Sequence, residues 1–333
     1  MFKKIKKYLF APKTVYTKAK NKIRCLYQKL HTKHLNFDVA ELFYQHNGEN
    51  DFLRYDMIVR LLAVENYFNI NDFGFDMYSR MQGARVKPEY VSESVERFKK
   101  LIASYETKGY NNASEIELDS QLHLIDGSHR MALAMYYDIK TINAKVRTYQ
   151  VDVFYSIEWF KINGFSDREC EILRNRYEQL KAHYQNPFTC IIWNPATAFY
   201  DKIIKDLSLF GKIINVEKID LNELNYKKLV REVFSIKDVE KRAMDEMLSN
   251  MSDGQDQVLH ICIVSLLIEQ PDYRWNKSTK KIKSKKCEII KSVVNNAYKS
   301  PTGEHCIALD IADNIFQSQH FLQLADRNLN KVN

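Results

Sequence analysis

The chain has 333 residues, of which 45% are hydrophobic and 28% are charged. This length and composition favour two globular domains and exclude a disordered tail or a small disulfide-stapled scaffold. The six cysteines lie far apart and we find no cleavable secretory signal, so we expect reduced thiols and a cytoplasmic location. The longest strongly apolar run, residues 258–268, is too short to cross a bilayer.

Positive charge is concentrated at the N-terminus. The net charge is +8, yet residues 1–34 contain eleven Lys or Arg and no Asp or Glu, and the other 299 residues have a net charge of −3. Because aromatic and aliphatic residues separate the basic ones, we predict a basic amphipathic arm over residues 1–50, of which residues 1–34 contact an anionic membrane surface. The alternative is a solvated or partner-binding arm. Nucleic acid is not the partner we expect, because the rest of the chain is not basic.

Apolar residues spaced by three and four predict helices over residues 51–68 and 92–108, the second capped by Ser92 and ended by Gly109. The aromatic, glycine-interrupted segment 71–81 between them predicts a stretch that crosses the floor of a site or wraps a core. Short elements complete this half of the chain: strands at 116–118, 122–125 and 141–149, and a helix at 128–137.

The second half begins with a helix that opens with a capping box, Ser166 to Glu169, and we place the domain boundary on or beside it. Strands then alternate with helices: strands at 190–193, 213–216, 258–263 and 306–311, and helices at 198–209 and 221–251. This order predicts an α/β fold whose second domain has a parallel or mixed sheet covered on both faces. The lysine-rich residues 274–286 predict an exposed loop, with a phosphate-rich ligand as the alternative.

The glycines exclude the common nucleotide-binding loops. A P-loop needs two glycines five positions apart, and a dinucleotide fingerprint needs them closer still. No two of the nine glycines are closer than Gly74 and Gly83. Zincin, Cys-x-x-Cys and Gly-x-Ser-x-Gly patterns are also absent from the sequence. A nucleotide must therefore be bound by a different kind of turn.

The sharpest signal is the sequence Asp126-Gly127-Ser128-His129-Arg130, which joins a predicted strand directly to a helix. Gly127 permits a close approach of backbone to ligand, and Ser128 is expected to cap the helix. The free N–H groups of the first helical turn and the forked guanidinium of Arg130 favour a phosphate there. The structural alternative is an ordinary glycine turn with His129 and Arg130 in solvent.

This motif resembles the Asp-Gly-x-His-Arg turn of the ParB/sulfiredoxin-like superfamily, and the likeness extends over about residues 75–149. In that superfamily, partition proteins hold CTP at this turn, sulfiredoxins hold ATP phosphates, and free serine kinases phosphorylate a small-molecule hydroxyl. Ser128 stands where sulfiredoxins have their reactive cysteine, and no helix-turn-helix pattern follows residue 149, so reductase and partition functions are disfavoured. The motif is closest to the kinase branch. Together with Asp-Phe-Leu-Arg-Tyr-Asp at residues 51–56, it resembles proteins of bacterial surface-polysaccharide gene clusters.

The resemblance implies an α+β domain that binds ATP or ADP with Mg²⁺. Residues 127–130 are expected to hold the phosphates, and Asp126 to bind Mg²⁺ or accept the proton of an attacking hydroxyl, unless it only hydrogen-bonds the turn's own amides. His129 is expected to donate to a phosphate oxygen, bridge to a carboxylate or cap the helix. Arg80 and Arg85 are expected to approach the nucleotide from the fold's first strand. Other carboxylates are candidates for the base: Glu65, Asp72 and Asp76.

A second group of polar residues follows the last predicted strand: Asp310, Asp313, Asn314 and, on the next helix, His320. Since open α/β sheets bind ligands at the carboxyl ends of their strands, these residues predict a sugar, acceptor or metal site. Helix capping by Asp313 or Asn314 is the alternative. Asn194 follows another strand, between Trp193 and Pro195, in the same way.

We therefore expect a phosphotransferase that moves a phosphoryl group from a nucleotide to a hydroxyl of a sugar, glycan or small alcohol in surface polysaccharide biosynthesis. The alternatives are a non-catalytic nucleotide-binding scaffold and a partition-type DNA-binding protein or nuclease. The predicted organisation has four parts: the arm over 1–50, the ParB/sulfiredoxin-like domain over 51–150, a linker helix region over 151–187, and a second α/β domain of unknown role over 188–333.

Overall fold

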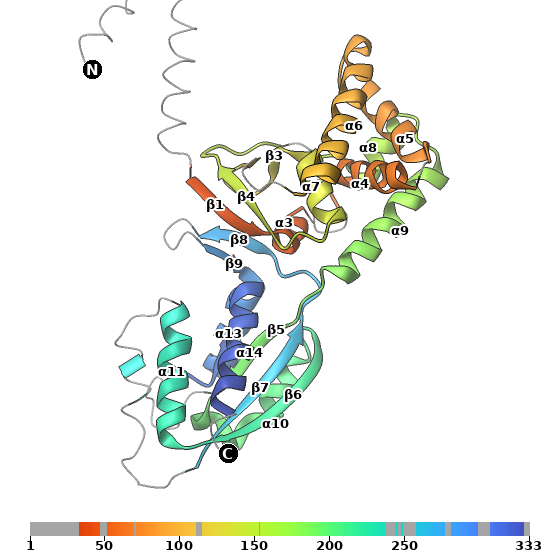
Figure 1. Ribbon diagram of the computed structural model, residues 1–333. Coiled ribbons are helices and arrows are strands. Elements are labelled where there is room, and N and C mark those ends of the chain that lie inside the picture. The colour runs from red at the N-terminus through yellow and green to blue at the C-terminus, as the bar shows by residue number, and fades with distance from the viewer. Residues whose placement is uncertain are drawn as a thin grey trace, which may run out of the picture. The chain divides into compact units, whose positions relative to one another are not determined.

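Figure 1 shows the computed structural model, which describes residues 33–46, 52–69, 71–110, 115–152, 154–237, 244–245, 248, 258–276, 281–298 and 307–329. The chain divides into two compact units, which we call the first unit (residues 1–42 and 46–177) and the second unit (residues 43–45 and 178–333). The division falls inside helix α9 (Asp167–His183), beside which the sequence predicts the domain boundary. The α/β fold class is confirmed, because the sheets contain both parallel and antiparallel pairs and carry helices.

A four-stranded sheet in the order β1-β4-β2-β3 supports the first unit. The central strand β4 (Thr141–Val146) pairs antiparallel with β1 (Lys33–Asp38) and parallel with β2 (Ile116–Leu118), which pairs antiparallel with β3 (Leu124–Asp126). The predicted arm over residues 1–50 is therefore too long, since residues 33–38 form the edge strand of this sheet and lead into α3 (Val39–Tyr44). Residues 1–32 lie outside the described part of the chain.

Helix α4 (Tyr55–Phe68) is the core element of the first unit, because every residue from Tyr55 to Val64 is buried. It packs against both α5 (Phe73–Gly83) and α7 (Ser128–Tyr136). The remaining helical elements are η2 (Pro88–Tyr90), α6 (Val91–Lys108) and α8 (Ile157–Ile162). The segment predicted to cross a floor is helix α5, since its buried Phe75, Tyr78 and Met81 recur at helical spacing. None of the described helices is long and apolar enough to span a bilayer.

The second unit contains a four-stranded sheet in the order β10-β5-β7-β6, formed by β10 (Leu309–Ile311), β5 (Phe188–Ile192), β7 (Leu259–Leu267) and β6 (Lys212–Leu221). Every pair in this sheet is antiparallel, so the predicted parallel or mixed sheet is wrong for this unit. The four strands of this sheet and the helices that follow β5 and β6 were predicted correctly. Their order does not determine strand direction, because direction depends on which strands become neighbours, and here β6 lies beside β7 and not beside β5.

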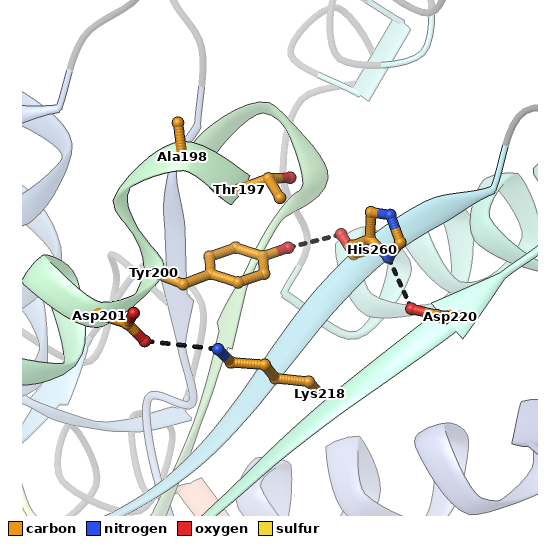
Figure 2. A pocket seen from close by; sticks show the side chains of 7 residues that line it. All are labelled: Thr197, Ala198, Tyr200, Asp201, Lys218, Asp220 and His260. Atoms are coloured by element: carbon orange, nitrogen blue, oxygen red, sulfur yellow. Dashed lines mark hydrogen bonds and ion pairs between the residues drawn. The ribbon is translucent and has the colours of Figure 1, made fainter.

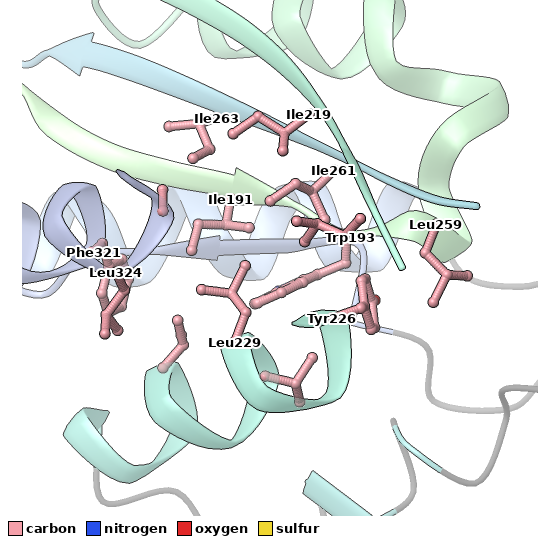
Figure 3. Close-up of a cluster of buried hydrophobic side chains, with 14 of the residues drawn as sticks. Ile191, Trp193, Ile219, Tyr226, Leu229, Leu259, Ile261, Ile263, Phe321 and Leu324 are labelled. Carbon is pink, nitrogen blue, oxygen red and sulfur yellow. The ribbon is translucent and has the colours of Figure 1, made fainter. Parts of the chain in front are cut away.

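The two faces of this sheet differ in character. One face carries polar side chains at the ends of β6 and β7, beside η3 (Asn194–Phe199) and α10 (Tyr200–Leu207), as Figure 2 shows. The other face carries the apolar core, in which Trp193 and alternate residues of β6 and β7 pack against α11 (Glu223–Lys237) and α14 (Ile315–Leu329) (Figure 3). Because side chains alternate along a strand, the same two strands supply both the core and the polar face.

The lysine-rich segment predicted as a loop forms strands and the start of a helix where the structure describes it, on both sides of residues 277–280. Residues Tyr273–Asn276 form β8 and Lys281–Ser284 form β9, an antiparallel pair, and helix α13 (Lys285–Ala297) begins immediately afterwards. The prediction was wrong because Tyr273 and Ile282 are buried and anchor the charged strands. Four cysteines lie in the described ranges and all are free and buried, as expected for reduced thiols: Cys170, Cys190, Cys262 and Cys287.

The contact between α4 and α5 gives a test of the fold. A Cβ atom on Gly74 would lie 2.4 Å from the carbonyl oxygen of Leu62 and 2.7 Å from Cα of Ala63. Because backbone atoms cannot move aside cheaply, we expect Gly74→Ala to lower the free energy of unfolding in urea by about 2 kcal/mol or more. Gly83→Ala is the matched control in the same helix, since a Cβ there meets nothing within 4 Å, and it should be neutral or stabilising by up to ~1 kcal/mol. Equal effects of the two substitutions would contradict the close helix contact.

Candidate functional site

A pocket of about 510 Å³ opens in the first unit where β3 meets α7. Three arginines line it from separate segments: Arg60 of α4, Arg85 after α5 and Arg97 of α6. The predicted motif lines it as well, through Asp126, Ser128 and His129. We call this the arginine pocket. The turn that the sequence singles out therefore opens onto a cavity whose lining is mainly cationic.

The turn at Gly127 has the geometry of an anion-binding helix start. Gly127 has a left-handed backbone with φ of 95°, and a Cβ atom there would lie 2.6 Å from Cγ2 of Ile116. A side chain at this position is therefore excluded on two grounds. The backbone N–H groups of Ser128, His129 and Arg130 make no hydrogen bond among the described residues, and the first N–H of α7 that is paired is that of Met131. They are the free donors expected at a helix N-terminus.

A buried ion network connects this turn to α4. The guanidinium of Arg54 binds both carboxylate oxygens of Asp56, at 2.7 and 3.1 Å, and also donates to Leu124 O at 2.6 Å and Ser128 Oγ at 3.2 Å. Asp56 also accepts from Arg60 Nη1 at 2.9 Å. Burial raises the pKa of Asp56, but the two guanidinium groups outweigh it and lower that pKa to about 2. Ser128 thus accepts from Arg54 and does not cap α7, contrary to the prediction.

Two pocket arginines hold buried nitrogen atoms that have no partner. Nε of Arg60 and Nη1 of Arg85 are buried and make no hydrogen bond among the described residues. Arg85 is held through Nε, which donates to the Tyr155 hydroxyl at 2.9 Å, and its guanidinium lies 4.5 Å from the centre of the Tyr155 ring. An unsatisfied charged donor is costly to bury, so a ligand that accepts these N–H groups gains a strong charge-assisted interaction.

The protonation of His129 follows from its neighbours. The side-chain amide of Gln82 donates to the Tyr78 hydroxyl at 2.6 Å, and that hydroxyl lies 2.7 Å from Nε2 of His129. We assign the hydrogen of the Tyr78 hydroxyl to Nε2, which places the ring proton of His129 on Nδ1. Burial and the nearby arginines lower the pKa of His129 to about 2, so the ring is neutral. Of the roles predicted for His129, this geometry favours a neutral N–H donor to an anion.

Asp126 lines the arginine pocket, whereas Arg130 does not. Asp126 lines the pocket with an exposed side chain; its Oδ1 accepts from the Gly127 amide at 2.7 Å, and its Oδ2 lies 3.6 Å from Nη2 of Arg130. Arg130 donates to the carbonyl of Glu115 and lies 3.6 Å from Asp126. Arg130 was expected to contact a phosphate, but its guanidinium lies outside the pocket lining and contacts Asp126 instead.

Of the remaining predicted residues, Arg85 alone lines this pocket. Arg80 is on helix α5, not on a strand, and its guanidinium binds Glu169 and the carbonyl of Gly164 and stacks on Phe165. Arg85, predicted alongside it, does line the pocket, from the turn after that helix. Of the carboxylates considered as a base, Glu65 pairs with Arg176, and none of the three lines the pocket: Glu65, Asp72 and Asp76.

The sequence analysis missed several residues of the site. The sequence did contain a signal for three of them: Arg54, Asp56 and Arg60. These charged residues, spaced by two and four, lie at the start of an otherwise apolar helix. Charges that are buried on such a helix need partners. Arg97 lies on an exposed helix face, where an arginine has no distinguishing pattern. The aromatic residues Tyr155 and Trp159 reach the pocket from beyond the stretch in which the motif lies, and nothing in their spacing indicated it.

The polar group predicted at the end of the last strand is internal. Asp310 is buried and bound by Lys237 at 2.8 Å, by Lys291 and by the Trp193 indole at 3.4 Å. Burial raises its pKa, but the two lysines outweigh it and lower that pKa to about 2. Asp313 lies 3.2 Å from Lys283, and Asn314 caps α14 through the Gln317 amide, as the alternative held. These contacts form a charged core, and His320 instead contacts the Phe316 ring.

Magnesium and phosphate place different demands on the arginine pocket. Mg²⁺ in nucleotide sites is bound by one or two carboxylates together with phosphate oxygens and water, so the exposed carboxylate of Asp126 is sufficient as a protein ligand if Mg²⁺ displaces Arg130 from Oδ2. The described residues contain no group of three or more side chains that would hold a metal by themselves. Phosphate oxygens match the unpaired donors of Arg60, Arg85 and the α7 amides.

The chain matches no model of a protein family, no curated protein and no solved structure. Its function is therefore inferred from the residues of the site. The likeness to the ParB/sulfiredoxin-like superfamily stays a prediction from the motif.

Two neutral histidines make the stability of the fold depend on pH. Burial, with Arg54 and His123 nearby, lowers the pKa of His46 well below its usual value of 6.5, as the pocket does for His129. Below pH 6.5 the unfolded chain therefore binds protons at these rings that the folded chain does not. Each ring lowers the free energy of unfolding by about 1.4 kcal/mol per pH unit as the pH falls from 6.5 towards 4.

Urea unfolding between pH 7 and 4.5 in a buffer without phosphate measures this slope. We expect His46→Leu to remove about half of it, because one of the two depressed rings is gone. The matched control His183→Gln replaces an exposed histidine and should leave the slope unchanged. A slope that is the same with and without His46 would contradict the neutral buried ring.

Proposed function

We propose that the chain is a phosphotransferase whose arginine pocket binds a nucleotide through its phosphates and transfers a phosphoryl group to a hydroxyl of a sugar, glycan or small alcohol. The observation that supports this most directly is the convergence of unpaired donors on one cavity. Arg60 and Arg85, each with one unpaired buried guanidinium nitrogen, line the same pocket as Ser128 and His129, whose backbone N–H groups are free at the start of α7. A ligand with several negative oxygens satisfies all of them at once.

The net positive charge of the pocket lining favours a ligand with several negative charges. Three guanidinium groups line the pocket and Asp126 is the carboxylate that lines it, so the lining is about two charges positive. This balance suits the di- or triphosphate of ATP or ADP better than a single carboxylate. The rings of Tyr155 and Trp159 also line the pocket, and an aromatic face next to cationic groups offers a nucleobase a stacking surface.

The transfer assigns distinct tasks to residues of this chain. The acceptor hydroxyl oxygen forms a bond to the terminal phosphorus, the bond from that phosphorus to the bridging oxygen breaks, and the nucleotide leaves with one phosphate fewer. Asp126 accepts the hydroxyl proton on Oδ2, while Oδ1 stays bound to the Gly127 amide. His129 and the α7 amides donate to the phosphoryl oxygens without moving a proton. Bound Mg²⁺ would neutralise phosphate charge and would be held by Asp126 and the phosphates.

Nucleotide binding is tested by thermal shift with ATP, ADP, CTP and GTP, each with and without Mg²⁺. We expect at least one nucleotide to raise the melting temperature, and Arg85→Gln to weaken its Kd by about tenfold or more through loss of a charge-assisted contact. Arg80→Gln is the matched control, because that side chain comes from the same helix region but binds Glu169 and Gly164. Equal loss in both variants, or no shift with any nucleotide, would contradict the pocket assignment.

Turnover is tested separately from binding. With a panel of sugars and small alcohols as acceptors, we expect wild type to form a phosphorylated product detectable by mass spectrometry. Asp126→Asn should keep nucleotide affinity within a few-fold and lower kcat by about 100-fold or more, because it removes the base. A protein that binds nucleotide tightly but never yields product from any acceptor supports the non-catalytic scaffold instead.

We further infer that residues 1–34 bind an anionic membrane surface, which would bring the enzyme to lipid-linked or surface glycans. Eleven basic residues without an acidic one support this, since each contributes about 1 kcal/mol near anionic lipid. Vesicle flotation is the test. The full chain should float with vesicles containing phosphatidylglycerol and not with neutral ones, and a chain that begins at residue 33 should float with neither.

A further inference from the structure

A second pocket, of about 290 Å³, lies on the polar face of the second unit's sheet. Figure 2 shows its main side chains: Tyr200 and Asp201 from α10, Lys218 and Asp220 from β6, and His260 from β7. Asp220 and His260 are directly opposite each other in the antiparallel pair, so their side chains leave the same face of the sheet. None of these residues takes part in the function proposed above.

The backbone of His260 is fixed on both sides by side chains. Its N–H donates to Oδ1 of Asn194 at 2.8 Å. Its carbonyl accepts from the Tyr200 hydroxyl at 2.6 Å, as Figure 2 shows. Both partners come from the segment η3–α10, which covers this end of the sheet. The predicted importance of Asn194 after its strand therefore has a specific structural basis. Because β5 ends at Ile192, opposite Cys262, these two side chains pair backbone groups of His260 that no described strand reaches on that side.

The ring of His260 is also oriented. Its Nδ1 lies 2.6 Å from Oδ1 of Asp220, and a carboxylate in this place accepts the Nδ1 proton. The lone pair of the neutral ring is then on Nε2. With side chains 45% and 70% exposed, His260 and Asp220 are reachable from solvent. A carboxylate that fixes the tautomer and stabilises the imidazolium is the arrangement by which enzymes make a histidine an effective base.

Lys218 supplies a cation at the same pocket. Its ammonium lies 3.4 Å from Asp201, and both side chains are largely exposed, so this pair is weak and readily exchanged for a ligand anion. Residues 218 and 220 alternate along β6, so the ammonium and the carboxylate of the dyad extend from the same face. The pocket thus combines an oriented base with an anion-binding group.

We propose that His260 and Asp220 form the general-base dyad of a second catalytic site, which hydrolyses a carboxylic ester of a small anion bound by Lys218. His260 Nε2 takes a proton from water while the water oxygen bonds to the acyl carbon. The bond from that carbon to the alcohol oxygen then breaks, and the imidazolium returns its proton to the leaving alcohol. Water and ester give acid and alcohol, and Asp220 balances the charge of the imidazolium. The small volume restricts the ligand to a compact molecule.

Two aryl esters test the site on the full chain: 4-acetoxybenzoate, which is anionic, and 4-nitrophenyl acetate, which is neutral. We expect hydrolysis above the buffer rate, slowed in D₂O because a proton moves in the rate-limiting step. His260→Gln should lower kcat by about 100-fold or more, and Asp220→Asn by about tenfold or more. Lys218→Met should raise KM for 4-acetoxybenzoate and leave KM for 4-nitrophenyl acetate unchanged.

The control is His183→Gln, which removes an exposed histidine of α9 and should keep both rates. It distinguishes the dyad from the general reactivity of surface imidazoles towards aryl esters. Wild-type hydrolysis no faster than buffer, or a rate in His260→Gln equal to that of wild type, would overturn the proposal. So would equal loss in His183→Gln and His260→Gln. These outcomes leave the arginine pocket untouched, because its residues and its nucleotide assay are separate.

Discussion

The carboxylate of Asp56 is the charge on which the first unit's pocket depends. It is fully buried and holds the guanidinium of Arg54 through two bonds and that of Arg60 through one. Arg54 in turn reaches the last strand before the motif, at Leu124, and the first residue of α7, at Ser128. One carboxylate therefore fixes the relative positions of α4, β3 and α7, the elements that meet at the pocket.

The energetics of this network favour a role in the proposed site over a contribution to the stability of the fold. Burying ions costs several kcal/mol each, and breaking a buried pair by removing one partner costs about 3–5 kcal/mol. Two cations share one anion here, so the network has an excess positive charge inside the fold. Nε of Arg60 remains without a partner among the described residues. An apolar core would avoid the cost of burying charge, whereas a cavity that binds anions needs the buried cations that incur this cost.

The sequence predicted well the features that short-range patterns determine. Helices α4, α6 and α7 follow from apolar spacing, and the capping box at Ser166 and Glu169 begins α9 as expected. It predicted poorly the features that depend on distant neighbours. Strand direction in the second unit depends on β6 lying beside β7, and β1 joins the first sheet by pairing with a strand about a hundred residues later. Arg130 was expected to contact a phosphate because it ends the motif at the start of the helix, but it does not line the pocket and donates to the carbonyl of Glu115. The motif thus indicated the location of the pocket but not all of the cations that line it.

The neutral ring of His129 affects how the charge of the pocket depends on pH. Tyr78 contacts Nε2, the ring stays neutral far below neutral pH, and burial lowers the pKa of Arg60 only to about 10, so neither His129 nor Arg60 changes its charge near neutral pH. The positive potential of the pocket is therefore constant across the range in which cells operate. Phosphate groups lose their second proton near pH 6. Under the proposed function, a change in phosphate affinity between mildly acidic and mildly alkaline conditions would therefore come from ionisation of the ligand and not from these two side chains.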